Sequence, residues 1–390
     1  MRPARIPLCA LITLLLLPPV VAVAGPVKVF ILSGQSNMEG KASVKTLDAV
    51  LGDPAQRDKI AHLKKDGEWV KREDVFVTYL DREETPLTPR YGPLSIGFGS
   101  PVGHRDPFTR ERSRHPGVGP ELGIGWVLGE RFDEPVLLIK AAWGGRALKA
   151  TFRPPSAMPG EAEMKERLMQ AQKKTPTLTL DELAKTYGSD YRKVLSETKR
   201  VLDNIEQYVP GYNEEDGYEL AGFIWFQGWN DMVGGGNPAY TEQLACFIRD
   251  MRRNLDAPGL PFVIGEMGNS GDKPNETVTG FRAQQKAVAE MPEFKGNVAY
   301  AKTASYWPSS LEMKQEWDAF RKLARANESK SEDDPTRIKP SEFYLVNWEQ
   351  KYADRLKFRS DRPYHYMGSG LCYYQMGESM ARAWLGLRGE

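Results

Sequence analysis

The sequence has few cysteines and histidines and no clear excess of charge of either sign. Its 390 residues include 3 Cys and 4 His, and 53 Lys and Arg stand against 52 Asp and Glu. Neither a Cys-x-x-Cys pair nor a grouping of His with Cys occurs, which argues against the usual structural zinc motifs. We therefore expect no metal site.

The only long apolar run lies at the N-terminus, and we expect the mature chain to lack it. Arg2 and Arg5 precede this run, which covers residues 6–23, and Ala22-Val23-Ala24 offers a small-residue cleavage site before Gly25. This pattern is typical of a secretory signal peptide. A membrane anchor is the alternative, but the run is barely long enough to span a bilayer and contains prolines. We expect secretion, to the periplasm or the extracellular space, and no stable membrane association after cleavage.

Removal of the signal peptide leaves a mature chain with almost no net charge. Two arginines are lost, so 51 basic residues face 52 acidic ones and the charge becomes −1. A chain without a basic excess has no electrostatic footprint for nucleic acid. Cys9 is lost as well. Cys246 and Cys372 either pair in an oxidising compartment or stay as small buried hydrophobes, and we favour the second interpretation.

Apolar runs alternate with helical periodicity along the rest of the chain. This alternation predicts an α/β fold with a central parallel sheet and helices on both faces. The strands are expected at Val27–Leu32, Val75–Tyr79, Val136–Lys140, Gly222–Phe226, Phe262–Glu266 and Val298–Ala301. We expect one domain over residues 25–390 with two surface insertions. The first, about 41–118, is expected to form long loops, and the second, about 306–360, to carry a helix.

A serine follows the first expected strand, in Ser33-Gly34-Gln35-Ser36-Asn37-Met38-Glu39. Ser36 is thereby placed at the carboxyl end of a strand, the edge where open α/β sheets bind ligands. Its hydroxyl, flanked by the side-chain amides of Gln35 and Asn37, is a candidate nucleophile. The alternative is a serine that caps a helix.

A histidine precedes the last expected helix, in Asp361-Arg362-Pro363-Tyr364-His365-Tyr366. The imidazole of His365 can take a proton from a serine and return it to a leaving group. A carboxylate such as Asp361 would hold its tautomer and stabilise the imidazolium. The alternative is a surface turn that happens to contain a histidine.

Two more strand ends carry groups suited to stabilising an oxyanion. Gly144 and Gly145 follow one strand and offer backbone N–H groups, and Gln227 and Asn230 follow another and offer side-chain amides. In acyl transfer such donors are worth about 3–4 kcal/mol each. Ordinary turn chemistry is the alternative for both. However, the carboxyl ends of parallel strands meet at one edge, so the parts of a hydrolase would converge there.

Together these segments resemble the SGNH hydrolase superfamily. Within it, they resemble the branch that contains the sialate O-acetylesterases and the acetyl xylan esterase-like enzymes of carbohydrate esterase family six. The matching segments are Gly34–Met38, Trp143–Gly145, Gly228–Asp231 and Asp361–His365, with weaker matches at Gly119–Glu121 and Phe281–Gln285. The resemblance implies a flavodoxin-like three-layer α/β/α sandwich, Ser36 as nucleophile and His365 as base. It also implies an oxyanion hole from the Ser36 amide, Gly144, Gly145 and either Gln227 or Asn230.

The sequence departs from the superfamily at the acid. The superfamily places its Asp three residues before the His, where this chain has Arg362, and Asp361 lies four residues before. Either Asp361 still reaches His365, or a backbone carbonyl or another acid orients the imidazole and the site is a Ser–His dyad.

The resemblance implies an esterase that removes O-acetyl groups from carbohydrate, of the acetyl xylan or sialate type, without a cofactor, and the signal peptide adds the expectation that it is secreted. The candidates for substrate binding are Gln35, Asn37, Arg146 and Trp229, whose ring is suited to stacking on a sugar. A non-catalytic carbohydrate-binding protein on the same fold is the alternative function.

Overall fold

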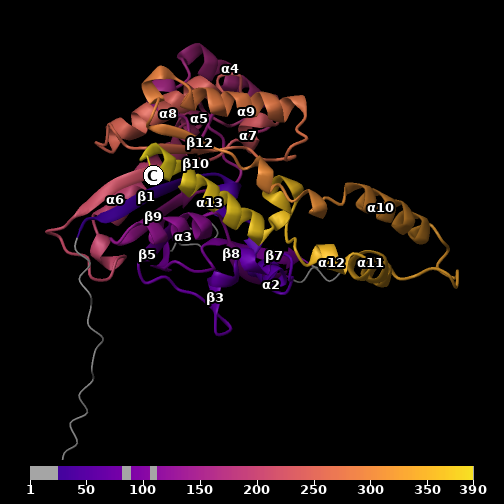
Figure 1. Cartoon of the computed structure of the whole chain (residues 1–390). Coiled ribbons are helices and arrows are strands. Elements are labelled where there is room, and N and C mark those ends of the chain that lie inside the picture. Colours follow the sequence, from indigo (N-terminus) through magenta and orange to yellow (C-terminus); the bar gives the residue numbers. More distant parts are fainter. Residues whose placement is uncertain (1–24, 81–88, 106–111, 390) are drawn as a thin grey trace, which may run out of the picture.

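The computed structural model describes residues 25–80, 89–105 and 112–389 (Figure 1). The expected signal peptide, residues 1–24, lies outside these ranges. Within them, no helix combines the length and the apolar character needed to cross a bilayer.

A sheet of seven strands forms the centre of the molecule, in the order β12-β11-β10-β1-β9-β5-β6. The strands are β1 (Val27–Gly34), β5 (Val75–Leu80), β6 (Pro89–Pro93), β9 (Val136–Ala142), β10 (Tyr218–Phe226), β11 (Phe262–Gly265) and β12 (Val298–Ala301). All neighbours are parallel except β5 and β6, which are antiparallel. All six expected strands are therefore confirmed. With β5 and β6 set aside, five strands remain, and from β9 to β12 they come second, first, third, fourth and fifth in the chain. This is the flavodoxin-like order, and its switch point lies at β1.

The strands are apolar along their whole length because helices cover both faces of the sheet. Successive side chains of β1 point to opposite faces. Phe30 and Leu32 belong to the apolar cluster on one face, and Ile31 to the cluster on the other. Such continuous burial explains why the sheet was visible in the sequence.

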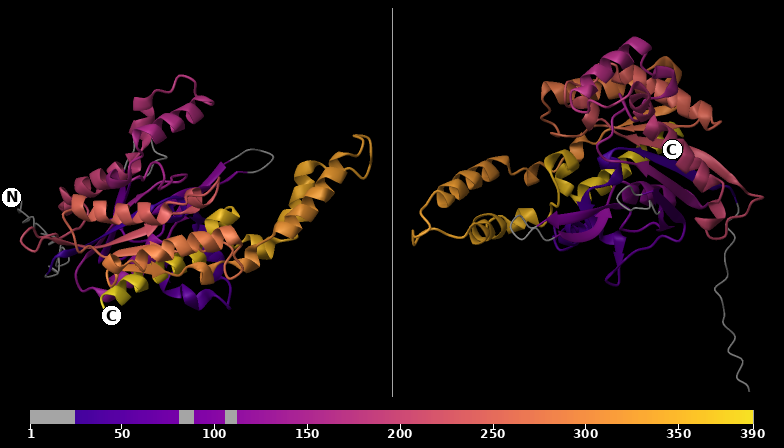
Figure 2. Two further views of the ribbon diagram at one scale, coloured as in Figure 1. Left: turned by 90° about the horizontal axis from the view of Figure 1, so that it is seen from above. Right: turned by 180° about the vertical axis from the view of Figure 1, so that it is seen from behind.

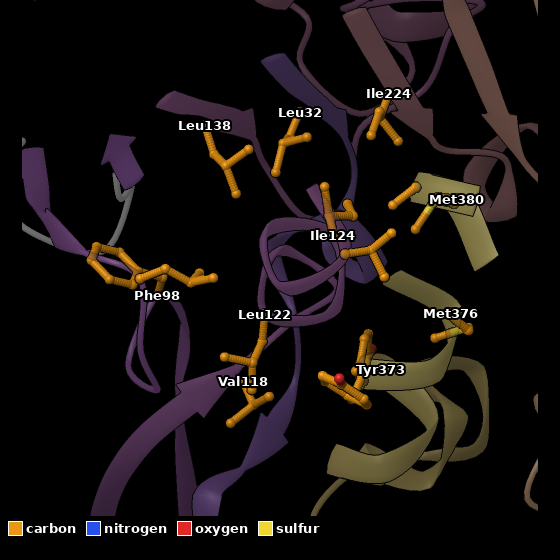
Figure 3. Packing of buried hydrophobic residues seen from close by; sticks show 14 of the residues in the cluster. Leu32, Phe98, Val118, Leu122, Ile124, Leu138, Ile224, Tyr373, Met376 and Met380 are labelled. Carbon is orange, nitrogen blue, oxygen red and sulfur yellow. The ribbon is translucent and has the colours of Figure 1, made fainter. Parts of the chain in front are cut away.

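Helices α3 (Glu121–Arg131) and α13 (Gly370–Leu387) cover one face, with α2 (Val44–Leu51) beside them. Leu32, Leu138 and Ile224 of the sheet face Ile124 of α3 and Met380 of α13 (Figure 3). The other face is covered by α6 (Ser189–Leu202), α8 (Tyr240–Asn254) and α9 (Glu276–Ala289). The expected three-layer sandwich is confirmed.

The segment 41–118 is more ordered than expected, and the expectation of long loops there is wrong. It contains α2, a hairpin of β3 (Lys64–Lys65) and β4 (Glu68–Trp69), and a sheet of β2 (Ala42–Ser43), β8 (Arg112–Val118) and β7 (Gly99–Arg105) in that order. Many of its apolar side chains enter the main core, among them Leu47, Val50, Ile60 and Leu63. The segment therefore stabilises the body of the protein.

The segment 306–360 forms an arm that extends away from the body (Figures 1 and 2). It holds α10 (Lys314–Glu328), α11 (Pro340–Tyr344) and α12 (Ala353–Leu356), where one helix was expected. The arm has its own small cluster of buried side chains, Met313, Phe320 and Trp348.

The remaining helices are short or peripheral. They are α1 (Ser36–Glu39), α4 (Glu161–Gln172), α5 (Leu180–Thr186) and α7 (Trp229–Met232). Cys246 on α8 and Cys372 on α13 are free thiols, as we favoured, although Cys246 is only half-buried.

Candidate active site

Ser36 lies on a tight turn between β1 and α1. Gly34 has φ +150°, and a Cβ at this position would lie 2.1 Å from the Phe226 carbonyl oxygen of β10, so only glycine fits. Helix α1 begins at Ser36, which is buried. The turn therefore sets the serine at the carboxyl end of β1, at the switch point of the sheet.

Gln35 ties this turn to the segment that follows β10. Its Oε1 accepts hydrogen bonds from the backbone N–H groups of Gly228, at 3.1 Å, and Asn230, at 3.4 Å. Its Nε2 donates to Asn230 Oδ1 at 3.1 Å. The side chain is 1% exposed. These contacts direct its polar atoms inward and argue against the substrate-binding role that we expected for Gln35.

Asn37 joins the serine turn to the histidine segment. Its Nδ2 donates to the Tyr364 carbonyl oxygen at 3.3 Å, and its Oδ1 accepts from the Tyr373 hydroxyl at 2.9 Å. The residue after Ser36 is thus bonded to the residue before His365, across 327 positions of sequence. Asn37 is 1% exposed, so its expected contact with substrate is also disfavoured.

Asp361 reaches His365 despite the unusual spacing. Its Oδ2 lies 2.9 Å from His365 Nδ1, and its Oδ1 accepts from the Arg362 backbone N–H at 2.7 Å. The chain turns back because Tyr366 and Met367 adopt left-handed φ values of +51° and +53°. This turn brings the Met367 carbonyl oxygen to the Asp361 N–H, at 3.1 Å. Left-handed backbone at two non-glycine residues is the kind of strain that gathers at functional sites.

The glycine segment lies against the serine. A Cβ on Gly144 would lie 3.4 Å from Ser36 Cβ and 2.9 Å from Glu39 Oε2, so a side chain there would crowd the nucleophile. Gly145 is exposed and has φ +74°. Gly144 therefore lies beside Ser36, where the sequence predicted the glycine segment.

Asp231 holds the glycine segment and the segment after β10 together. Its buried carboxylate accepts from the backbone N–H groups of Leu148, at 2.6 Å, and Lys149, at 3.0 Å. It also accepts from Gln227 Nε2 at 2.7 Å. Gln227 Nε2 donates in addition to the Arg146 carbonyl oxygen at 3.2 Å, so both of its amide hydrogens are used inside the protein.

Asn230 differs from Gln227 in how its side-chain NH₂ group is used. The residue is half-buried, and its Oδ1 accepts from Gln35. Among the residues that the structure describes, none accepts a hydrogen bond from Asn230 Nδ2. Of the two amides that the sequence offered for an oxyanion hole, the geometry favours Asn230.

An aromatic-walled cavity adjoins these segments. The Trp229 and Tyr364 ring centroids are 5.5 Å apart, and the Tyr364 ring lies 4.4 Å from the His365 ring. Trp229 and Tyr364 line a cavity of about 720 Å³ that borders the site, although Ser36 and His365 are not among its lining residues. Arg146 is half-buried, with Nε 3.4 Å from Asp190 Oδ2.

Lys140 is a supporting residue that we did not single out from the sequence. It is fully buried two residues before the end of β9, and Nζ donates to Glu121 Oε2 at 2.7 Å and to the Glu39 carbonyl oxygen at 2.7 Å. Burial lowers the pKa of this ammonium, and the Glu121 carboxylate opposes that effect. A cation at the C-terminus of a helix is favourable, and α1 ends at Glu39. The signal available in the sequence was a lysine at the end of the otherwise apolar strand expected at Val136–Lys140.

A serine, a histidine with a carboxylate and a glycine segment, gathered where parallel strands end, characterise the serine esterases built on an α/β sandwich. The chain belongs to the family described as carbohydrate esterase, sialic acid-specific acetylesterase, whose model matches residues 26–304. This membership indicates a carbohydrate acetylesterase, a hydrolase. The match ends before the arm and does not reach His365. In the described residues, no group of three or more His, Cys, Asp or Glu is arranged to hold a metal ion.

Several solved structures are similar at low identity. A protein from Arabidopsis thaliana is 15% identical, with a TM-score of 0.45, over 93% of this chain and 98% of that one. A carbohydrate acetylesterase from Xanthomonas citri, XAC1771, is 14% identical, with a TM-score of 0.37, over 70% of this chain and 49% of that one. NanS is 13% identical, with a TM-score of 0.41, over 72% of this chain and 78% of that one. No curated protein is significantly similar to the chain.

Proposed function

We propose that the protein is a secreted serine esterase that removes O-acetyl groups from carbohydrate, with Ser36 as nucleophile and His365 as general base. The observation that carries this proposal is the hydrogen bond from Asn37 to Tyr364, which joins the direct neighbours of the two residues. Family membership supports the acetylated carbohydrate substrate.

The geometry suggests how a proton would move. Nδ1 of His365 faces Asp361, which leaves Nε2 to take the proton from the Ser36 hydroxyl as its oxygen attacks the acetyl carbonyl carbon. When the tetrahedral intermediate collapses, Nε2 returns the proton to the sugar oxygen, which leaves as a hydroxyl group. Water then attacks the acetylated serine by the same path and releases acetate.

The oxyanion would be stabilised by the Ser36 N–H, the backbone at Gly144 and Asn230 Nδ2. Gln227 has both amide hydrogens committed, so its role is to position the turn. Gln35 and Asn37 are likewise positioning residues. Trp229, half-exposed beside Tyr364, is the residue best placed to stack on a sugar ring.

Replacing the nucleophile tests the proposal. Ser36→Ala should lower the rate of acetate release from 4-nitrophenyl acetate and from acetylated xylo-oligosaccharides by about 10³-fold or more, because the acyl-enzyme can no longer form. Ser33→Ala is the matched control, since Ser33 is buried in β1 and its hydroxyl has no hydrogen-bond partner in the described part of the chain. If Ser36→Ala retains a rate near that of the wild type, Ser36 is not the nucleophile.

Substrate preference decides between the two acetylated sugar types. Faster acetate release from acetylated xylo-oligosaccharides than from O-acetylated sialic acid would assign the xylan type, and the reverse order would assign the sialate type.

The alternative function, a non-catalytic carbohydrate-binding protein, rested on the unusual position of Asp361 in the sequence. The 2.9 Å contact between Asp361 and His365 argues against that alternative. Secretion predicts a mature N-terminus at Gly25.

A further inference from the structure

One buried amide in the cavity beside the candidate active site has no partner. Asn269 lines the cavity of about 720 Å³ and is 3% exposed. Neither its Nδ2 nor its Oδ1 has a hydrogen-bond partner among the described residues. Buried amides are nearly always paired in native proteins, and an unpaired one is costly. The packing of the protein alone therefore does not account for the unpaired amide of Asn269.

The loop that carries Asn269 is held firmly in place. The Arg282 guanidinium of α9 donates to three of its carbonyl oxygens, those of Met267 at 2.8 Å, Asn269 at 2.9 Å and Gly271 at 3.0 Å. Ser270, the next residue, has a left-handed φ of +70°. A strained loop clamped at three points fixes the position of one side chain. This gives a purpose to the Phe281–Gln285 segment, which the proposed mechanism does not use.

The same loop is also tied to the histidine turn. The Gly268 N–H donates to the Tyr366 hydroxyl at 2.9 Å, and Tyr366 directly follows His365. The cavity walls include the half-exposed rings of Trp229, Tyr364 and Trp307. Asn269 thus has a set position relative to the reacting groups, in a cavity with aromatic walls.

We propose that Asn269 is a specificity-determining residue that binds two neighbouring hydroxyl groups of the sugar seated in this cavity. The amide of an asparagine offers an NH₂ donor group and a carbonyl acceptor, and vicinal hydroxyls of a pyranose can accept from the one and donate to the other. The aromatic rings would contact the apolar faces of the sugar while the amide reads its hydroxyls. The proposal rests on the proposed esterase function and goes further by naming the group that recognises the carbohydrate.

The variant Asn269→Leu tests this role because leucine has a similar volume and no polar atoms. The sugar substrate is acetylated xylo-oligosaccharide or O-acetylated sialic acid, whichever the wild type cleaves faster, and the reference substrate is 4-nitrophenyl acetate, which has no sugar. We expect the substitution to lower kcat/KM for the sugar substrate at least about tenfold more than kcat/KM for the reference. We also expect Tm to stay the same or rise, because a buried unpaired amide has been removed. Asn275→Asp is the control. Asn275 lines the same cavity, but it is exposed and its Oδ1 caps α9 by accepting from the Val278 N–H at 3.0 Å.

The outcomes separate this inference from the proposed function. If Asn269→Leu lowers both rates equally, or lowers Tm by several degrees, the amide has a structural role and the inference is wrong. The esterase itself is judged separately by the Ser36→Ala rate on 4-nitrophenyl acetate. If the wild type cleaves that ester through Ser36 but neither acetylated sugar, both the carbohydrate assignment and the role of Asn269 fall while the nucleophile stands.

Discussion

At the scale of single residues, the site is built from side chains that hold other side chains. Gln35, Asn37 and Asp231 are buried, and together their polar atoms connect the serine turn, the glycine segment, the segment after β10 and the histidine segment. Asp361 does the same for His365 through one hydrogen bond. The groups proposed to react are therefore placed by a layer of amides and carboxylates that need not touch the substrate.

Asp361→Asn should lower kcat by about 10²–10⁴-fold, because an amide no longer favours the tautomer of His365 that accepts the proton at Nε2. The fold should be unaffected, since the side chain is partly exposed and keeps its shape. Steady-state kinetics with 4-nitrophenyl acetate and a thermal melt measure both effects. Asp354→Asn on α12, an exposed carboxylate, is the control. An unchanged rate would mean that another group orients the histidine.

The partners of these residues explain what the sequence revealed about the site and what it did not. Ser36, His365 and the glycines were visible because each follows a strand or precedes a helix in a short, recognisable segment. The inward roles of Gln35 and Asn37 were not, because their partners lie 193 and 327 positions away. Nothing local marks Asn269, whose distinguishing feature is that its side-chain amide has no hydrogen-bond partner in the described part of the chain.

At the scale of elements, the short helix α1 depends on a buried ion pair. Lys140 of β9 and Glu121 of α3 lie 2.7 Å apart with almost no exposure. The lysine also donates to the carbonyl oxygens of Glu39, at 2.7 Å, and Phe98, at 2.8 Å. Three segments of the chain therefore meet at one ammonium group directly behind the helix that carries Ser36.

Lys140→Met should reduce the free energy of unfolding by about 3–5 kcal/mol, because Glu121 is left as a buried charge without its partner. Denaturant unfolding measures the change. Lys165→Met is the control, since Lys165 and Glu161 form an exposed pair, and it should change stability by less than about 1 kcal/mol. Equal effects of the two substitutions would show that the buried pair contributes no more than a surface pair.

The fold was predictable where elements are buried and regular. The parallel strands are continuous apolar runs because both of their faces are covered. The strands of the small sheet were missed because β8 reads Arg-Ser-Arg-His-Pro-Gly-Val, which has neither an apolar run nor clean alternation. Edge strand β6 contains two prolines and a glycine, which are normally evidence against a strand.

At the scale of the whole molecule, the arm is an appendage with a core of its own. Met313, Phe320 and Trp348 form a cluster separate from the clusters of the body in the described ranges. The arm follows β12 and ends directly before Asp361, so the chain returns from it into the histidine segment. The body should therefore fold without support from the arm helices.

Trp348→Ala should increase hydrogen exchange over residues 314–350 while shifting the main thermal transition by less than about 2 °C, because local clusters open independently of the global unfolding. Trp225→Ala is the comparison, since Trp225 is fully buried in β10 and its loss should cost about 3–5 kcal/mol. Hydrogen-exchange mass spectrometry and circular dichroism measure the two effects. A large fall in Tm for Trp348→Ala would mean that the arm and the body unfold as one unit.

The most direct test of the account is covalent trapping of the serine. We predict that a fluorophosphonate forms one adduct, which peptide mass spectrometry places on Ser36, and that His365→Ala slows its formation by about 10²-fold or more, because the imidazole takes the proton from the attacking hydroxyl. An adduct on a different residue, or labelling of Ser36 at the same rate without His365, would contradict the account.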